Sequence, residues 1–237
     1  MKHNYKKIVL SILVLLAAGI SPNLFVISQA GAANLSDLAV NFLLPSIIIV
    51  VLLIIISYYM GVKDLSSQIG KGLSAGMIST LGLEIVREVG FHLGGMPGDM
   101  PKLLGVLLLN QFAQGPDTLS NIAGWSYHFW NGASFGIVYI VLFGRGREWG
   151  GVIYALLIGI GFMASPAVIP LGVGHFGVDF GIGFPITVLL AHLAFGIILG
   201  WLIFKWNEEG LSIFSTINKI INHKKGTRQA KYIEAKS

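Results

Sequence analysis

The chain has 237 residues, of which 54% are hydrophobic and 11% are charged, and its formal net charge is +5. Soluble domains carry roughly 25% charged residues, so this composition excludes an ordinary soluble protein and indicates an integral membrane protein. The absence of cysteine excludes disulfides, thiolate nucleophiles, cysteine-ligated zinc and iron–sulfur clusters. The positive surplus is concentrated in the last 20 residues, beside a membrane span, which argues against nucleic acid as a partner.

The first 33 residues contain an apolar segment, Ile8–Ala30, that follows three lysines. A spanning helix needs roughly 20 apolar residues, and this segment is long enough. The small residues from Ala30 to Ala33 also suit cleavage by a signal peptidase. Residues 1–33 are therefore either a signal peptide or a first membrane helix that is kinked at Pro22.

The rest of the chain is predicted to form three regions. Residues 34–68 hold an additional span, Phe42–Met60, and a cytoplasmic loop. Residues 69–206 form a core of four spans. Residues 207–237 form a basic cytoplasmic tail that contacts anionic lipid headgroups. The predicted core spans are Ser74–His92, Ile122–Phe143, Gly150–Val168 and Phe184–Phe204.

Two segments of the core are not predicted to cross the membrane. Leu103–Phe112 is too short and is expected to be a re-entrant or interfacial helix. Leu171–Gly183 is rich in glycine and lies between two prolines, so it is expected to be a loop. The predicted fold class is thus an all-α, polytopic transmembrane helix bundle of five or six spans.

The distribution of positive charge predicts the orientation of this bundle. Cytoplasmic loops are enriched in Lys and Arg. With six spans and a cytoplasmic N-terminus, 14 of the 16 Lys and Arg residues fall on the cytoplasmic side. Arg87 falls within a span, and Lys102 falls outside. This excess of Lys and Arg on one side disappears if residues 103–112 cross the membrane, so we expect that they do not cross. The result is a multi-pass plasma-membrane protein with a cytoplasmic C-terminus.

This topology places a set of polar residues in the extracytoplasmic half of the membrane. Glu84, Glu88 and His92 are spaced four residues apart along one helix. The ligand-binding residues predicted here are Glu84, Glu88, Asn131, His175 and Asp179, and the predicted metal ligands are His92, His128 and His192. His175 and Asp179 are expected in a loop that covers the site. No catalytic residue is assigned.

Two of the predicted spans repeat one pattern. His128-x3-Gly132-x3-Gly136 matches His192-x3-Gly196-x3-Gly200. Glycines at this spacing are typical of close helix packing in membranes. A histidine at the same offset in both spans suggests that two imidazoles converge where these helices pack.

Three interpretations of the polar residues remain open. The first is structural: Arg87 pairs with Glu84 or Glu88, and the histidines bond to carbonyls or to Asn131. The second is a site for a divalent transition metal, for which imidazole and carboxylate are suitable ligands, with haem a weaker option. The third is a protonatable or ligand-binding site in a transport path.

Residues 70–204 resemble small, uncharacterised prokaryotic integral membrane proteins that are classified as a domain of unknown function. The matching segments are "GKGLSAGMISTLGLE", "GMPGDMPKLLGVLL", a histidine before "FGIVY", "GGVIYALLIG" and "AHLAFGIILG". The resemblance implies a four-helix core with an intervening element around 97–112. It implies no activity, cofactor or catalytic residue.

The sequence therefore predicts binding or transport of a metal ion or small ligand at a polar site in the extracytoplasmic half. One alternative is a non-catalytic structural or assembly subunit of a membrane complex, with a homo-oligomer or another membrane subunit as its partner. A weaker alternative is a membrane metalloenzyme with Glu84 or Glu88 as general base.

Overall fold

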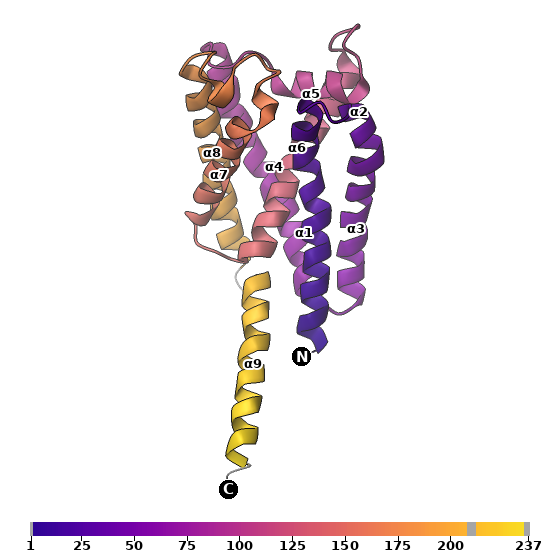
Figure 1. The fold of residues 1–237 in the computed structure, drawn as a ribbon, viewed down its shortest axis with the longest axis vertical. Coiled ribbons are helices and arrows are strands. Elements are labelled where there is room, and N and C mark those ends of the chain that lie inside the picture. The colour runs from indigo at the N-terminus through magenta and orange to yellow at the C-terminus, as the bar shows by residue number, and fades with distance from the viewer. Residues whose placement is uncertain (1, 208–211, 235–237) are drawn as a thin grey trace.

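The computed structural model describes residues 2–207 and 212–234, and every regular element within them is a helix (Figure 1). This confirms the all-α prediction. The elements are α1 (Lys2–Gln29), α2 (Leu35–Leu38), the π-helical turn η1 (Ala39–Leu43), α3 (Leu44–Tyr59), α4 (Lys63–His92), α5 (Met100–Leu109), α6 (Thr118–Phe143), α7 (Gly150–Ala164), the short 3-10 turns η2 (Pro166–Val168) and η3 (His175–Gly177), α8 (Gly183–Trp206) and α9 (Ile213–Glu234).

Three helical segments of the described chain are long and apolar enough to cross a membrane: His3–Gln29, Leu35–Tyr59 and Gly183–Trp206. They correspond to α1, to the continuous helical segment that runs from α2 through η1 to α3, and to α8. α4 and α6 are also long, with 30 and 26 residues, but polar side chains within them lower their hydropathy. α7 is apolar and has 15 residues. These helices identify the chain as a membrane protein.

The long helices run side by side along one axis, with α4 in the centre (Figure 1). α4 packs against α3, α6 and α8, while α7 packs on α8 and α1 packs on α3 and α6. The start of the chain and α9 lie at one end of the bundle, called here the terminal end. α5 lies at the opposite end, called here the α5 end.

Glycines bring α4 close to α6 in the half of the bundle nearer the terminal end. A Cβ atom added to Gly72 would lie 2.8 Å from the Cα of Ile137, and one added to Gly76 would overlap the carbonyl of Gly132. A Cβ on Gly136 would in turn overlap the carbonyl of Gly72. Small residues permit such close backbone contact, which strengthens packing in a membrane.

A second glycine seam joins α7 to α8. A Cβ atom added to Gly151 would lie 2.6 Å from the Cα of Gly200, and one added to Gly196 would lie 2.8 Å from the Cα of Val152. The two repeated patterns of the sequence thus face different partners: α6 packs on α4, and α8 packs on α7. The two helices that carry the repeat were expected to pack on each other, but each forms a separate seam with another helix.

Several helices begin or end differently from the prediction. α4 begins at Lys63, because the polar residues before Ser74 continue the helix instead of forming a loop. α5 begins at Met100 and includes Pro101, since proline is tolerated in the first turn, where its missing N–H costs nothing. Asn110 ends α5 in the left-handed conformation, with φ of 54°.

The chain after the last span is also helical where it is described. α9 extends from the terminal end away from the bundle (Figure 1). Its first turns contact α1 and α6, with Ile213, Thr216 and Ile220 buried. The predicted basic tail, 207–237, therefore includes a helix, and its residues 208–211 and 235–237 lie outside the described residues.

Candidate functional site

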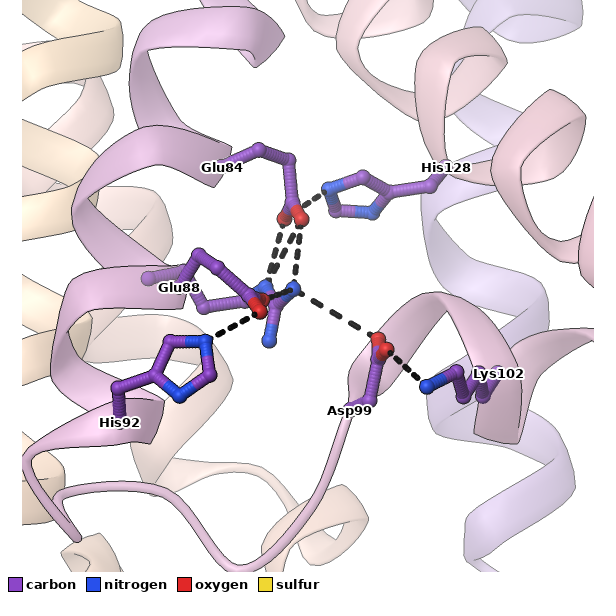
Figure 2. A network of polar contacts seen from close by, with 7 residues as sticks. Glu84, Glu88, His92, Asp99, Lys102 and His128 are labelled. Atoms are coloured by element: carbon purple, nitrogen blue, oxygen red, sulfur yellow. Dashed lines mark hydrogen bonds and ion pairs between the residues drawn. The ribbon is translucent and has the colours of Figure 1, made fainter.

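A buried cluster of charges lies on α4 toward the α5 end of the bundle (Figure 2). Arg87 and Glu84 are 4% and 6% exposed, and a spacing of three residues places them on one helix face. The Nε of Arg87 donates to both carboxylate oxygens of Glu84 at 2.9 Å. Its Nη2 lies 2.8 Å from Glu84 Oε2 and 2.9 Å from Glu88 Oε2. Two of the three guanidinium nitrogens are thus paired with carboxylates.

Neighbouring helices add further charged groups to this cluster. The Nε2 of His128, on α6, lies 2.9 Å from Oε1 of Glu84. Asp99 precedes α5, and its Oδ1 lies 3.6 Å from Arg87 Nη2. The other Asp99 oxygen lies 3.3 Å from the Nζ of Lys102. The cluster therefore ties α4 to α5 and α6, and it surrounds one arginine with three carboxylates.

The cluster borders a cavity of about 440 Å³. This volume is within the range of small-molecule binding sites, roughly 300–1,000 Å³. The wall is formed by α1, α4, α5, α6, α7 and α8, and most of its residues are apolar. The polar residues of the wall are Asn23, Thr80, Arg87, His128, Asn131, Ser165, Thr187 and His192.

Two polar groups on this wall, the buried Arg87 and the half-buried His192, can form further hydrogen bonds. The Nη1 of Arg87 is buried and has no hydrogen-bond partner among the described residues. The Nδ1 of His192 lies 2.8 Å from the carbonyl oxygen of Val188, and a carbonyl can only accept, so Nδ1 carries the proton. In the neutral ring Nε2 is then a bare acceptor. A buried donor without a partner is costly, which makes Arg87 Nη1 the most informative atom of the site.

α1 is an integral wall of the cavity and is held there by polar contacts. The Oγ of Ser21 donates to Oδ1 of Asn131 at 2.5 Å, and the hydroxyl of Tyr127 donates to the Ser21 carbonyl at 2.9 Å. The next residues of α1, among them Pro22 and Phe25, line the cavity. Near the terminal end, Lys7 of α1 is buried and pairs with Asp64 of α4.

The structure brings part of the predicted site together. His128, Asn131 and His192 line the cavity, and Glu84 contacts both Arg87 and His128. The two imidazoles reach this cavity from different helices, α6 and α8, each of which packs on α4. They share the cavity even though their glycine seams face different helices.

Other predicted residues lie away from the cavity, which corrects the predicted site. The side chain of His92 is 72% exposed and pairs with Glu88, itself 47% exposed, at 3.2 Å. Consecutive helical residues are rotated by about 100°, so Glu84 and His92, eight residues apart, differ by about 80°. That rotation takes His92 off the buried face.

The segment between α7 and α8 is a loop, as expected, but its two predicted ligand-binding residues do not reach the cavity. His175 and Asp179 are exposed and are not among the residues that line the cavity. Val173 is fully buried and packs with Phe184 and Val188 beside the cavity. The loop is therefore attached through apolar contacts, and its polar side chains point outward.

The geometry does not support the predicted metal site. Among the residues that the structure describes, no group of three or more His, Cys, Asp or Glu side chains is arranged to hold a metal ion. Both oxygens of Glu84 face Arg87, and one of them also contacts His128. This carboxylate has little capacity left for a metal or for the general-base role considered from the sequence.

Several residues of the wall were not found by sequence reasoning. Thr80 and Thr187 carry no motif, and Asn23 lies in a segment that also resembles a signal peptide. Arg87 was expected only as an ion-pair partner. The available signal was its position, since an arginine inside an apolar span usually faces the bundle or a polar cavity.

Comparison with known proteins gives no match: no family model, curated protein or solved structure is similar to this chain. The resemblance to small prokaryotic membrane proteins therefore stays a prediction. The functional argument rests on the cavity and its chemistry.

Proposed function

We propose that the chain is a six-span plasma-membrane protein that binds a small ligand in this cavity, for binding or transport from the extracytoplasmic side. The observation that carries the proposal is the unpartnered, buried Arg87 Nη1 on the wall of an otherwise mostly apolar cavity. Such a cavity with a few convergent polar groups is the usual form of a small-molecule site.

The proposed orientation has the terminal end in the cytoplasm. It is supported by the placement of the chain start and α9 at one end of the bundle, opposite α5 (Figure 1). The turn between α6 and α7, with Arg145 and Arg147, is on that same side of the helices. Cationic loops are retained in the cytoplasm, which leaves the cavity nearer the extracytoplasmic face.

The absence of cysteine makes this orientation directly testable. Ala113 is exposed between α5 and α6, and Glu148 is exposed between α6 and α7. In intact cells, a membrane-impermeant maleimide should label Ala113→Cys and leave Glu148→Cys unlabelled until the cells are opened. Labelling of Glu148→Cys alone in intact cells would invert the topology and reject an extracytoplasmic site.

The proposal also requires that α1 remain in the mature protein, because α1 forms one wall of the cavity. We therefore interpret residues 1–33 as a first membrane helix and not as a cleaved signal peptide. The intact mass of the purified protein should include these residues. A mature chain that starts after Ala30 would remove the wall and overturn the proposal.

Occupancy of the cavity is tested on protein purified from membranes with mild detergent. Native mass spectrometry, organic extraction and elemental analysis should find a small organic molecule bound to the chain, without a stoichiometric metal. A stoichiometric transition metal would instead restore the metal hypothesis. Protein that carries neither would favour the structural alternative.

The structural alternative has one observation in its favour. A second hollow lies on the outside of α6, and most of its lining residues are aromatic or apolar. A helix of a partner subunit would fit such a surface, and stable co-purification of that subunit would support an assembly role. The lining residues are Met77, Thr118, Asn121, Ile122, Trp125, Ser126, Phe129 and Trp130.

A further inference from the structure

The exposed residues of the cavity wall lie on two helices, α1 and α7. Among the described residues that line it, Asn23 on α1 and Gly161 on α7 are exposed, and the others are buried or half-buried. A Cβ atom added to Gly161 would meet nothing within 4 Å, so there is open space at this point. These exposed residues favour an opening, called here the mouth, that faces sideways, between α1 and α7.

The surfaces beside this mouth are apolar. Ile27 on α1 is 38% exposed, and Leu157 and Ile160 on α7 are 62% and 44% exposed. In a membrane protein, large exposed aliphatic side chains on long helices face the hydrocarbon core. A molecule that passes between α1 and α7 comes from the lipid phase, so it must be soluble in lipid.

The charged residues at the inner wall restrict the charge that the head group of such a molecule can carry. Arg87 is close to three carboxylates, those of Glu84, Glu88 and Asp99, at 2.8 to 3.6 Å. Their negative charge offsets the guanidinium, so an anionic head group gains little net attraction. A neutral oxygen atom can still accept a hydrogen bond from Nη1 without adding negative charge.

The half-buried His192 on α8 can accept a hydrogen bond. Because Nδ1 of His192 donates to the carbonyl of Val188, its Nε2 offers a lone pair. A hydroxyl group can meet either demand, since its oxygen accepts and its hydrogen donates. Most of the remaining wall, which includes Val26, Phe135 and Phe162, is apolar and suits a hydrocarbon portion.

We propose that the ligand is a neutral, lipid-soluble amphiphile with a hydroxyl-bearing head, and that it enters the cavity sideways from the bilayer between α1 and α7. This proposal rests on the proposed function, since it assumes that the cavity binds a ligand. It adds the chemical class of that ligand and its path.

The test uses the full-length protein in lipid nanodiscs and four probes with the same 12-carbon chain: 1-dodecanol, dodecanoate, dodecylamine and dodecane. Binding is measured by native mass spectrometry and by the rise in melting temperature that a ligand of the folded state produces. We expect 1-dodecanol to bind the wild type at least tenfold more tightly than any of the other three probes.

The path is tested by filling the mouth. Gly161→Phe places a ring in the open space at the rim, and Gly161→Leu is a smaller filling variant if the first folds poorly. Gly70→Phe is the matched control, because Gly70 is also a helical glycine with open space around its Cβ and does not line the cavity. Gly161→Phe should bind 1-dodecanol at least tenfold more weakly, and Gly70→Phe should bind like the wild type.

Different failures have different meanings. Tighter binding of dodecanoate or dodecylamine than of 1-dodecanol would overturn the neutral head group, while the cavity would still be a binding site. Equal binding of 1-dodecanol by Gly161→Phe and wild type would overturn the sideways path. If none of the four probes binds and no molecule co-purifies, the inference and the proposed function both fail.

Discussion

The two halves of this bundle differ in how closely α4 packs against its neighbours. In the half nearer the terminal end, Gly72 and Gly76 let α4 touch the backbone of α6, and an added Cβ has no room. Beyond Gly76 the next residues of α4 on this side, Thr80, Leu83 and Arg87, line a cavity. We infer that close packing in one half holds α4 and α6 in place, so that the other half can keep an open cavity between the helices.

Buried polar atoms without a hydrogen-bond partner occur in both halves of the described chain, among them Ser134 Oγ and the Tyr139 hydroxyl in the closed half. The cavity half differs because its unpartnered Arg87 Nη1 belongs to a buried charged group on the wall of a cavity. We infer that this polarity serves a ligand.

Removing the arginine should have the largest effect on stability. Arg87→Met leaves the buried carboxylate of Glu84 without its main partner, and breaking a buried ion pair costs about 3–5 kcal/mol. The double variant Glu84→Gln with Arg87→Met should recover much of this loss. Melting temperatures of the single and double variants check the prediction, and a single variant as stable as the wild type would show that the pair is not buried.

Adding a side chain to the seam should have the next largest effect. Gly76→Leu would force apart the backbones of α4 and α6, and overpacking typically costs about 1–3 kcal/mol. Gly70→Leu is the control, since Gly70 lies on the same helix with nothing within 4 Å of its Cβ. Thermal unfolding should separate the two variants. Equal stability would mean that the seam is not closed.

The smallest effect is expected at the start of α6. The Asp117 side chain accepts a hydrogen bond from the backbone N–H of Ser120 at 2.7 Å. The backbone N–H of Asp117 in turn donates to the Ser120 hydroxyl oxygen. The hydrogen bond from the Ser120 backbone lowers the pKa of Asp117 below its ordinary value. A lowered pKa means that the cap stabilises α6 at neutral pH and that this contribution is lost as the pH falls through the lowered pKa.

Asp117→Ala should therefore lower the melting temperature slightly at pH 7 and have no effect at a pH low enough to protonate the carboxyl group. The cap lies at the cavity half of α6, so this variant should leave the glycine seam unchanged. A difference of equal size at both pH values would contradict the cap as the source of the effect.

The sequence predicted the helices better than the site, for physical reasons that particular residues illustrate. Apolar length defines a span, and Phe184–Phe204 was placed within two residues of α8 at each end. The start of α4 was missed by 11 residues, because a polar stretch at a membrane surface is compatible with either helix or loop.

The sequence favours a depth in the membrane for each predicted residue, through its charge pattern, but it says less about the direction of a side chain around its helix. His128, Asn131 and His192 line the cavity, but His92 is rotated to the surface, and His175 and Asp179 point outward. The contribution of α1 depends on contacts between Ser21 and Asn131, 110 residues apart, which no local pattern encodes.

The contrast between an open cavity and a closed seam is tested most directly by two single cysteines in this cysteine-free chain. Thr187 lies on the cavity wall and is 6% exposed, whereas Ser79 lies in α4 away from the cavity and is 0% exposed. With membrane-embedded protein and N-ethylmaleimide, the account predicts that Thr187→Cys is modified and Ser79→Cys is not, while both react after denaturation. Equal protection of the two thiols in the folded protein would contradict an accessible cavity and the function proposed for it.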